Sequence, residues 1–213
     1  MSQSELPQID YFDVLNNRRS VFSFDPDKDL EDDLLRKIIN KATLAPSSYN
    51  LQPWRVLAVK SQRMREKVYE KACSQQKVLD APVLLVVLGD KDGYFRENPA
   101  WEVKKELGKV DEDKIEKIIK HNDNVTYNTP EKKLAFAIRN SSLLAMSIML
   151  TAKAFGVDTH PMIGFKPDKI REIFEIEDKI EINMLISVGY HDSTHQLKPR
   201  EERLSYEQIV TEY

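Results

Sequence analysis

The aliphatic run at 83–88 constrains the fold of this chain more than any other segment. It consists of six consecutive aliphatic residues and lies between Pro82 and Gly89. A strand that is apolar on both faces must be covered on both sides, whereas a half-exposed strand alternates apolar and polar residues. The run therefore predicts a central strand with helices packed against each face of its sheet.

Segments with helical periodicity alternate with strand-like segments along the rest of the chain. The spacing of apolar residues predicts helices over about 9–15, 30–42, 62–72, 131–155 and 168–174. Short apolar runs predict strands over 54–59 and 180–188, and a possible strand or arm follows residue 190. We expect Asp29 and Ser61 to be N-caps, Pro46 to stop the second helix and Gly156 to end the long one. No repeat or linker divides the chain, so we expect one domain over 1–213, of class α+β or α/β around one sheet.

Residues 91–130 differ from their surroundings because they are highly charged and only weakly periodic. Such a segment predicts an excursion or lid rather than part of the core. Its aromatic side chains are candidates to wall a pocket, and packing beneath a lid is the alternative; they are Tyr94, Phe95, Trp101 and Tyr127. The helix expected next is apolar nearly all round over its second half, so it needs cover on every side, some of which a second subunit could provide.

Composition excludes several classes of protein. The formal net charge is -3 and charges of both signs are interspersed, which disfavours nucleic-acid binding. Cys73 is the one cysteine, so neither an intrachain disulfide nor a cysteine-based zinc cluster can form. The N-terminal residues do not resemble a secretory signal, and the apolar stretch at 141–155 falls short of the roughly 20 residues that span a membrane. We therefore expect a cytoplasmic protein with no membrane or nucleic-acid partner.

Familiar catalytic and phosphate-binding motifs are missing from the sequence. Its six glycines form no G-x-G pair, and there is neither a Walker loop nor a G-x-S-x-G elbow. The four histidines are too scattered to predict a metal site, although His191 and His195 have a spacing that a helix could use. Any phosphate must therefore be held by side chains.

Two polar segments remain as candidate binding sites. Arg18, Arg19 and Ser20 place two guanidinium groups and a hydroxyl at the end of a predicted helix, where they could bind a phosphate or form a solvated basic loop. The second segment, A-P-S-S-Y-N-L-Q-P-W at 45–54, concentrates amides and hydroxyls between two prolines. It could be a turn-rich connection, or it could recognise the hydrogen-bonding edge of a planar heterocycle.

Together, R-R-S and the later P-S-S-x-N-x-Q-P-W resemble the nitroreductase-like family of FMN-dependent oxidoreductases. Similar segments at 74–78, 161–165 and 203–207 extend the resemblance across nearly the whole chain. It implies an α+β, three-layer α/β/α fold with a central, mostly antiparallel sheet and helices on both faces. It also implies a C-terminal arm that reaches the partner subunit of a homodimer, with FMN bound at the subunit interface.

The resemblance further implies which residues bind FMN, with no separate catalytic side chain and no metal. Those expected at the phosphate and ribityl chain are Arg18, Arg19, Ser20 and Arg203, with Lys198 and Arg200 as further basic candidates. Those expected at the pyrimidine edge are Gln75 and Lys77, and those beside the flavin N5 are Met162, Ile163 and Gly164. The partner subunit would contribute Pro46, Ser47, Ser48, Asn50 and Gln52.

Three positions depart from the family pattern. Phe22 stands where many members have Lys or Arg near the flavin N1 and O2, so Lys77 alone would stabilise the negative charge of reduced flavin. Ile163 stands where some members have Glu, although a backbone N–H is still present there. Glu201 occupies a second, usually basic, C-terminal position, and the two basic residues before it are substitutes.

The resemblance implies an enzyme that takes hydride from NADH or NADPH and reduces a small, planar, electron-poor acceptor, nitroaromatic or quinone-like, by a ping-pong mechanism. Dehydrogenation, dehalogenation and flavin reduction are alternatives within the family. A non-catalytic FMN-binding module is a further alternative, which Phe22 keeps open. A dimerisation module without a cofactor would require every motif match to be accidental.

Overall fold

The computed structural model describes residues 9–213. Its strands are β1 (Trp54–Val59), β2 (Val83–Asp90), β3 (Asp158–Met162) and β4 (Ile180–Gly189). Its helices are α1 (Tyr11–Asn17), α2 (Asp32–Ala42), α3 (Gln62–Lys71), α4 (Lys77–Asp80), α5 (Ala100–Glu106), α6 (Glu112–His121), α7 (Pro130–Ala154), α8 (Pro167–Phe174) and α9 (Tyr206–Ile209), with the short turns η2 (Ser48–Asn50) and η3 (Asn122–Thr126).

The strands form one antiparallel sheet in the order β1-β2-β4-β3. β2 lies between β1 and β4, and its residues 83–88 are all buried, which confirms the central strand predicted from the aliphatic run. The strands predicted at 54–59 and 180–188 are confirmed as β1 and β4.

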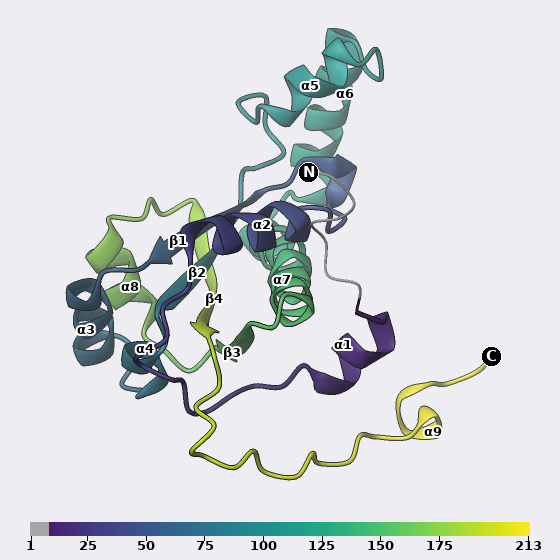
Figure 1. The fold of residues 1–213 in the computed structure, drawn as a ribbon. Coiled ribbons are helices and arrows are strands. Elements are labelled where there is room, and N and C mark those ends of the chain that lie inside the picture. The colour runs from purple at the N-terminus through teal and green to yellow at the C-terminus, as the bar shows by residue number, and fades with distance from the viewer. Residues whose placement is uncertain (1–8) are drawn as a thin grey trace.

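Helices cover both faces of this sheet. Leu85 and Val87 of β2 belong to a hydrophobic cluster shared with α2 and α7, whereas Leu84 and Val86 belong to a second cluster shared with α3 and α8. Figure 1 shows α7 on one side of the strands and α3 and α8 on the other. The predicted three-layer α/β/α arrangement around a mostly antiparallel sheet is therefore confirmed.

α7 packs unusually close to the sheet where β2 ends. A Cβ atom added to Gly89 would lie 2.5 Å from the backbone oxygen of Ala137 in α7, so a larger residue would force the two elements apart. At its other end α7 stops where predicted, with Gly156 in the left-handed conformation at a φ of 74° and its N–H donating to the Lys153 carbonyl.

α7 is also long and apolar enough, by length and composition, to cross a membrane. Its buried residues pack instead against β2, β4 and α2, as expected of the core helix of this fold. Three apolar side chains on α7 remain exposed within the described part of the chain, and they are Ile138, Leu143 and Met146. The sequence predicted that this helix is covered on every side, and residues 9–213 cover it only in part.

Residues 91–130 are more regular than the sequence predicted. This segment folds into α5, α6 and η3, which project from the sheet and helices in Figure 1. Tyr94, Trp101 and Ile115 are fully buried in a small separate core with Leu51 and Phe136. For Tyr94 and Trp101 this is the packing given above as the alternative to walling a pocket, whereas the helices were not predicted because the few apolar residues are dispersed among many charges.

Other differences concern boundaries and short elements. α2 begins after Glu31 rather than Asp29, so Asp29 is not its cap, and Ser61 occupies the N-cap position of α3 without a side-chain cap bond. β3 was not predicted as a strand, because it is short and contains Pro161, which an edge strand tolerates. The segment after residue 190 is an exposed arm that carries only the four-residue α9.

Replacing Ile148 by Ala tests the role of α7 in the core. Ile148 is fully buried between α7 and the sheet, so we expect the free energy of unfolding to fall by about 2–5 kcal/mol. Val103→Ala on α5 is the matched control, because Val103 is exposed and should change this quantity by less than about 0.5 kcal/mol. Equal urea midpoints for the two variants would contradict the assignment of α7 as a core helix.

Candidate functional site

The segment after α1 lies against β3 at the edge of the sheet. α1 ends at Asn17, and Arg18 continues in extended conformation. Ser20 forms a parallel bridge with Thr159, and the Val21 N–H donates to the Thr159 carbonyl at 3.1 Å. Backbone hydrogen bonds thus hold the R-R-S motif beside β3, although the two are far apart in the sequence.

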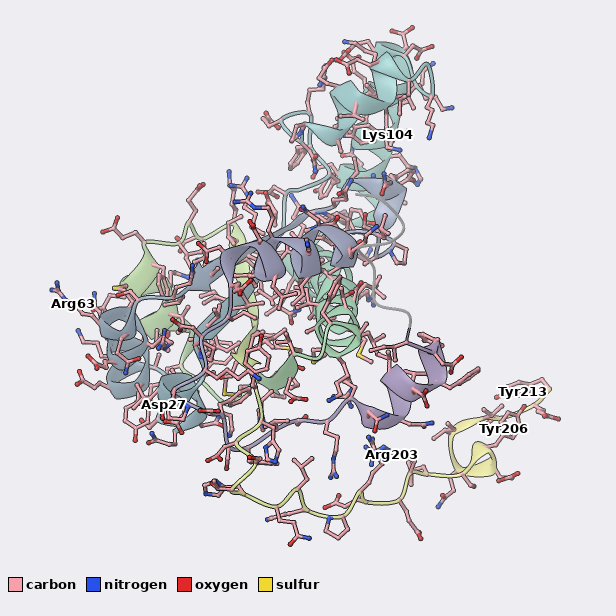
Figure 2. The ribbon with its side chains drawn as sticks, in the orientation of Figure 1. Asp27, Arg63, Lys104, Arg203, Tyr206 and Tyr213 are labelled. Carbon is pink, nitrogen blue, oxygen red and sulfur yellow. The ribbon has the colours of Figure 1, made fainter. Side chains whose placement is uncertain are left out.

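The C-terminal arm crosses the same place. Arg200 donates from Nη2 to the carbonyls of Asn16 (2.6 Å) and Arg18 (3.0 Å), while Arg19 donates from Nη2 to the carbonyl of Lys198 (2.5 Å). Figure 2 shows Arg203 further along the arm, beside α1. The arm and the end of α1 therefore form one basic cluster, which we call the arginine cluster: Arg18, Arg19, Lys198, Arg200 and Arg203.

The arginine cluster carries unbalanced positive charge. Burial, followed by the charges of Arg200 and Arg203, lowers the pKa of Arg18 below its ordinary value. Within residues 9–213, no carboxylate forms an ion pair with any member of the cluster. Like charges repel, so this arrangement suits an anionic group bound among them.

A second cationic group lies at Lys77, at the start of α4. Its side chain is buried, and its Nζ donates to Gln75 Oε1 at 2.8 Å and lies 5.0 Å from the centroid of the Phe22 ring. Burial lowers the pKa of Lys77, and no carboxylate pairs with it in the described part of the chain. An ammonium that is buried without a counter-ion is costly unless a ligand supplies electron-rich atoms.

The segment after β3 completes this second group. Met162 is buried at the end of β3, whereas Ile163 and Gly164 are exposed. Gln75 Nε2 donates to the Gly164 carbonyl at 3.4 Å. The structure thus brings together the residues predicted for the pyrimidine edge and for the N5 side, next to the R-R-S segment; their roles in binding stay predictions.

His160 packs against Phe22 and was not singled out from the sequence. Its ring contacts Phe22 edge to face at 4.8 Å, and its Nδ1 lies 2.9 Å from the Val21 carbonyl, so Nδ1 carries the hydrogen. Burial, followed by the charge of Lys77, lowers the pKa of His160 to about 4. The imidazole is therefore neutral at pH 7 and leaves Lys77 as the single positive charge of this group.

The P-S-S-x-N-x-Q-P-W segment adopts an uncommon backbone conformation. Tyr49, Asn50 and Gln52 have φ values of 53°, 51° and 50°, in the left-handed region that residues other than glycine seldom occupy. Such conformations are unfavourable and persist only where surrounding contacts fix them. Three non-glycine residues of this kind within four positions indicate a loop shaped for function.

Hydrogen bonds with two asparagine side chains, one buried and one half-buried, fix this loop. The Ser48 N–H donates to Asn140 Oδ1 of α7 at 2.8 Å, and Asn98 Nδ2 donates to the Leu51 carbonyl at 2.9 Å. Within the loop, the Gln52 N–H donates to Ser47 Oγ at 3.0 Å. Its shape therefore depends on α7 and on the segment before α5.

This loop forms no hydrogen bond or ion pair with the arginine cluster or with Lys77 among residues 9–213. It follows α2, near α5 and α6, whereas α1 and the C-terminal arm lie at the other end of α7 (Figure 1). Within one chain, the residues expected at the phosphate and those expected at the flavin ring therefore lie together, whereas those expected from the partner subunit lie apart and form a third group. The third group consists of Pro46, Ser47, Ser48, Asn50 and Gln52.

Comparison with known proteins identifies the family. The sequence profile described as "Nitroreductase family" matches residues 15–190. The chain belongs to the nitroreductase family. A relative from Bacillus subtilis, MhqN, provisionally named as an NAD(P)H nitroreductase, is 34% identical over 198 residues, which cover 92% of this chain and 96% of MhqN.

Solved structures agree with this assignment. The crystal structure of ydfN from Bacillus subtilis, also provisionally called a nitroreductase, superposes with a TM-score of 0.86 at 33% identity and covers 95% of this chain and 98% of ydfN. A protein of the same provisional description from Exiguobacterium sibiricum, solved in complex with FMN, has a TM-score of 0.82 at 27% identity, with 95% and 97% coverage. The family and fold expected from the motifs are confirmed.

Within this nitroreductase-family chain, sequence reasoning missed the residues that position others. His160, Asn98 and Asn140 act through contacts with residues far away along the chain, so no local motif marks them. Burial raises the pKa of the Cys73 thiol, which disfavours the reactive thiolate.

His160 gives the folded protein a testable pH dependence. Its pKa is about 4 when folded and near 6.5 when unfolded, so below pH 6.5 the unfolded state binds a proton that the folded state does not. We expect this residue to reduce the free energy of unfolding by roughly 3 kcal/mol between pH 7 and pH 4. His160→Gln should lose that component in urea titrations at a series of pH values, whereas His121→Gln, at an exposed position of α6, should retain it. Identical pH profiles for the two variants would contradict the buried neutral imidazole.

Proposed function

We propose that this chain is an FMN-dependent oxidoreductase that takes hydride from NADH or NADPH and reduces a small, planar, electron-poor acceptor, nitroaromatic or quinone-like, by a ping-pong mechanism. The observation that carries the proposal is the presence of two cationic groups without carboxylate partners at the two ends of segment 18–22: the arginine cluster at Arg18, and Lys77 over the ring of Phe22. FMN combines a phosphate at one end with a ring that gains negative charge on reduction at the other. Membership of the nitroreductase family supports this assignment.

The arginine cluster fits the phosphate. Arg18 makes no side-chain hydrogen bond to described residues, and Arg200 is held by two backbone carbonyls, so guanidinium N–H groups remain to bind phosphate oxygens. Ser20 adds a hydroxyl nearby, towards the ribityl chain. Because the arm contributes several of the cations, phosphate binding would also fix the arm against α1.

Lys77 and Gln75 fit the pyrimidine edge of the ring. Gln75 Oε1 orients the Lys77 ammonium, the face of Phe22 holds it by a cation–π contact, and neutral His160 adds no second charge. When bound, FMN would accept hydride at N5 and later return two electrons to an acceptor. Lys77 would stabilise the negative charge that the reduced ring develops, and the backbone of Ile163 and Gly164 would supply an N–H on the N5 side.

The separate third group is explained if the protein is a homodimer. The loop at 46–52 would then contact the flavin that is bound mainly by the partner subunit. Exposed apolar side chains on α7 and on the arm support such an interface, and they are Ile138, Leu143, Met146, Leu204, Tyr206 and Ile209. The arm at 191–213 would extend over the partner.

The proposal includes the organisation and setting of the chain. Residues 1–213 would form one domain in which 91–130 is a lid over the acceptor site. A cytoplasmic location is compatible with the single free thiol, Cys73. A non-catalytic FMN-binding module is the second candidate, because Phe22 removes one cation from the pyrimidine edge and so disfavours the reduced, anionic flavin.

Arg18→Gln tests the phosphate site. We expect FMN to bind about tenfold or more weakly, since a charge-assisted hydrogen bond is lost, whereas riboflavin, which lacks the phosphate, should bind as before. Fluorescence titration of the flavin-free protein measures both affinities. Arg63→Gln is the control, because Arg63 is exposed on α3 at the far side of the molecule in Figure 2. Equal losses for FMN and riboflavin would exclude Arg18 as a phosphate ligand.

The reaction itself is tested by the visible spectrum of the protein purified without added flavin. We expect a yellow protein that NADH or NADPH bleaches under anaerobic conditions, with colour restored by a quinone or nitroaromatic acceptor. A yellow protein that neither nicotinamide reduces would favour the binding module. A colourless protein unable to take up FMN would refute the proposed function.

A further inference from the structure

A small cavity lies beside the strained loop, at the point where the loop meets α7. Its volume is about 200 Å³, and the lining residues come from the loop, from α7 and from the residue after η3. Those that the argument uses are Pro46, Ser48, Tyr127, Phe136, Arg139 and Asn140. A cavity of this size suits a ligand with one ring.

Aromatic side chains give this cavity a fixed wall. Tyr127 and Phe136 have ring centroids 4.6 Å apart, and Tyr94 contacts both, at 5.0 Å and 5.6 Å. Phe136 and Tyr94 are buried in the core beneath α5 and α6. A rigid aromatic wall favours a planar ligand, and Tyr127 alone among the aromatics expected to line an acceptor pocket reaches this cavity.

The polar side chains that line the cavity include no carboxylate. The hydroxyls of Ser48 and Tyr127 and the guanidinium of Arg139 form no hydrogen bond with residues 9–213. Asn140, by contrast, uses its amide for the Ser48 N–H and the Phe136 carbonyl. Ser47, which also lines the cavity, accepts the Gln52 N–H at Oγ. Recognition of a ligand therefore falls to serine and tyrosine hydroxyls and one positive charge, a set that selects oxygen atoms with negative charge.

We infer that this cavity is the acceptor subsite and that Arg139 selects acceptors bearing an anionic oxygen group, such as a carboxylate, on a single planar ring. The inference rests on the proposed function, because the loop that borders the cavity is the one proposed to contact the flavin. Arg139 is a specificity-determining residue here. It is exposed on α7 and contributes to no described ion pair, so its replacement leaves the fold intact.

Benzoate and benzamide provide a matched pair of probes that do not turn over. They differ in charge but little in shape, and their binding to the oxidised FMN-loaded protein can be followed by the change in flavin absorbance. We expect the wild-type protein to prefer benzoate and Arg139→Gln to bind benzoate about tenfold more weakly, with benzamide unchanged. Arg36→Gln, at an exposed position of α2, should behave as the wild type.

Turnover of 4-nitrobenzoate and 4-nitrobenzamide gives an independent measurement. Arg139→Gln should lower kcat/KM about tenfold for 4-nitrobenzoate and leave that for 4-nitrobenzamide unchanged. Equal effects on both compounds, no preference for the anion in the wild type, or a raised KM for NADH or NADPH instead would each overturn the inference while the flavin chemistry stands. A protein that does not retain FMN, or whose FMN neither nicotinamide reduces, refutes the proposed function and this inference with it.

Discussion

The contact between α7 and β2 is the constraint on which the other parts of the molecule depend. Gly89 permits the backbones to meet at Ala137, and the next turn of α7 then places Asn140 against the loop that follows α2. One helix thus contributes to the core, fixes the strained loop at 46–52 and lines the small cavity. A change in the packing of α7 would alter both the stability of the sheet and the shape of the loop.

The clustering and burial of positive charge distinguish the site from the remaining surface. Some exposed cations outside it pair with carboxylates, for example Arg96 with Glu112 and Lys169 with Glu172, and others stand alone on the described surface. Lys77 and the arginine cluster are unpaired within residues 9–213, and Lys77 is buried as well. Sites that accept negative charge need such unpaired cations, and the fold tolerates them only while local backbone carbonyls and aromatic faces hold them.

Much of the architecture could be predicted because burial leaves a periodic signal. The run at 83–88 and the apolar face of α7 identified the core, and R-R-S with P-S-S-x-N-x-Q-P-W identified the family. β3 was not predicted because a five-residue edge strand with a proline shows little periodicity. α5 and α6 were not predicted because the core they form is small. His160 and Asn140 could not have been found, because their partners lie 139 and 92 residues away in the sequence.

The order of elements along the chain has a consequence for biogenesis. Lys198, Arg200 and Arg203 follow β4, the last strand of the sheet in the sequence, and they close the basic cluster against α1. During synthesis, every strand therefore leaves the ribosome before the arginine cluster can be complete. In the order of the sequence, docking of the arm against α1 is thus the last of these contacts that can form.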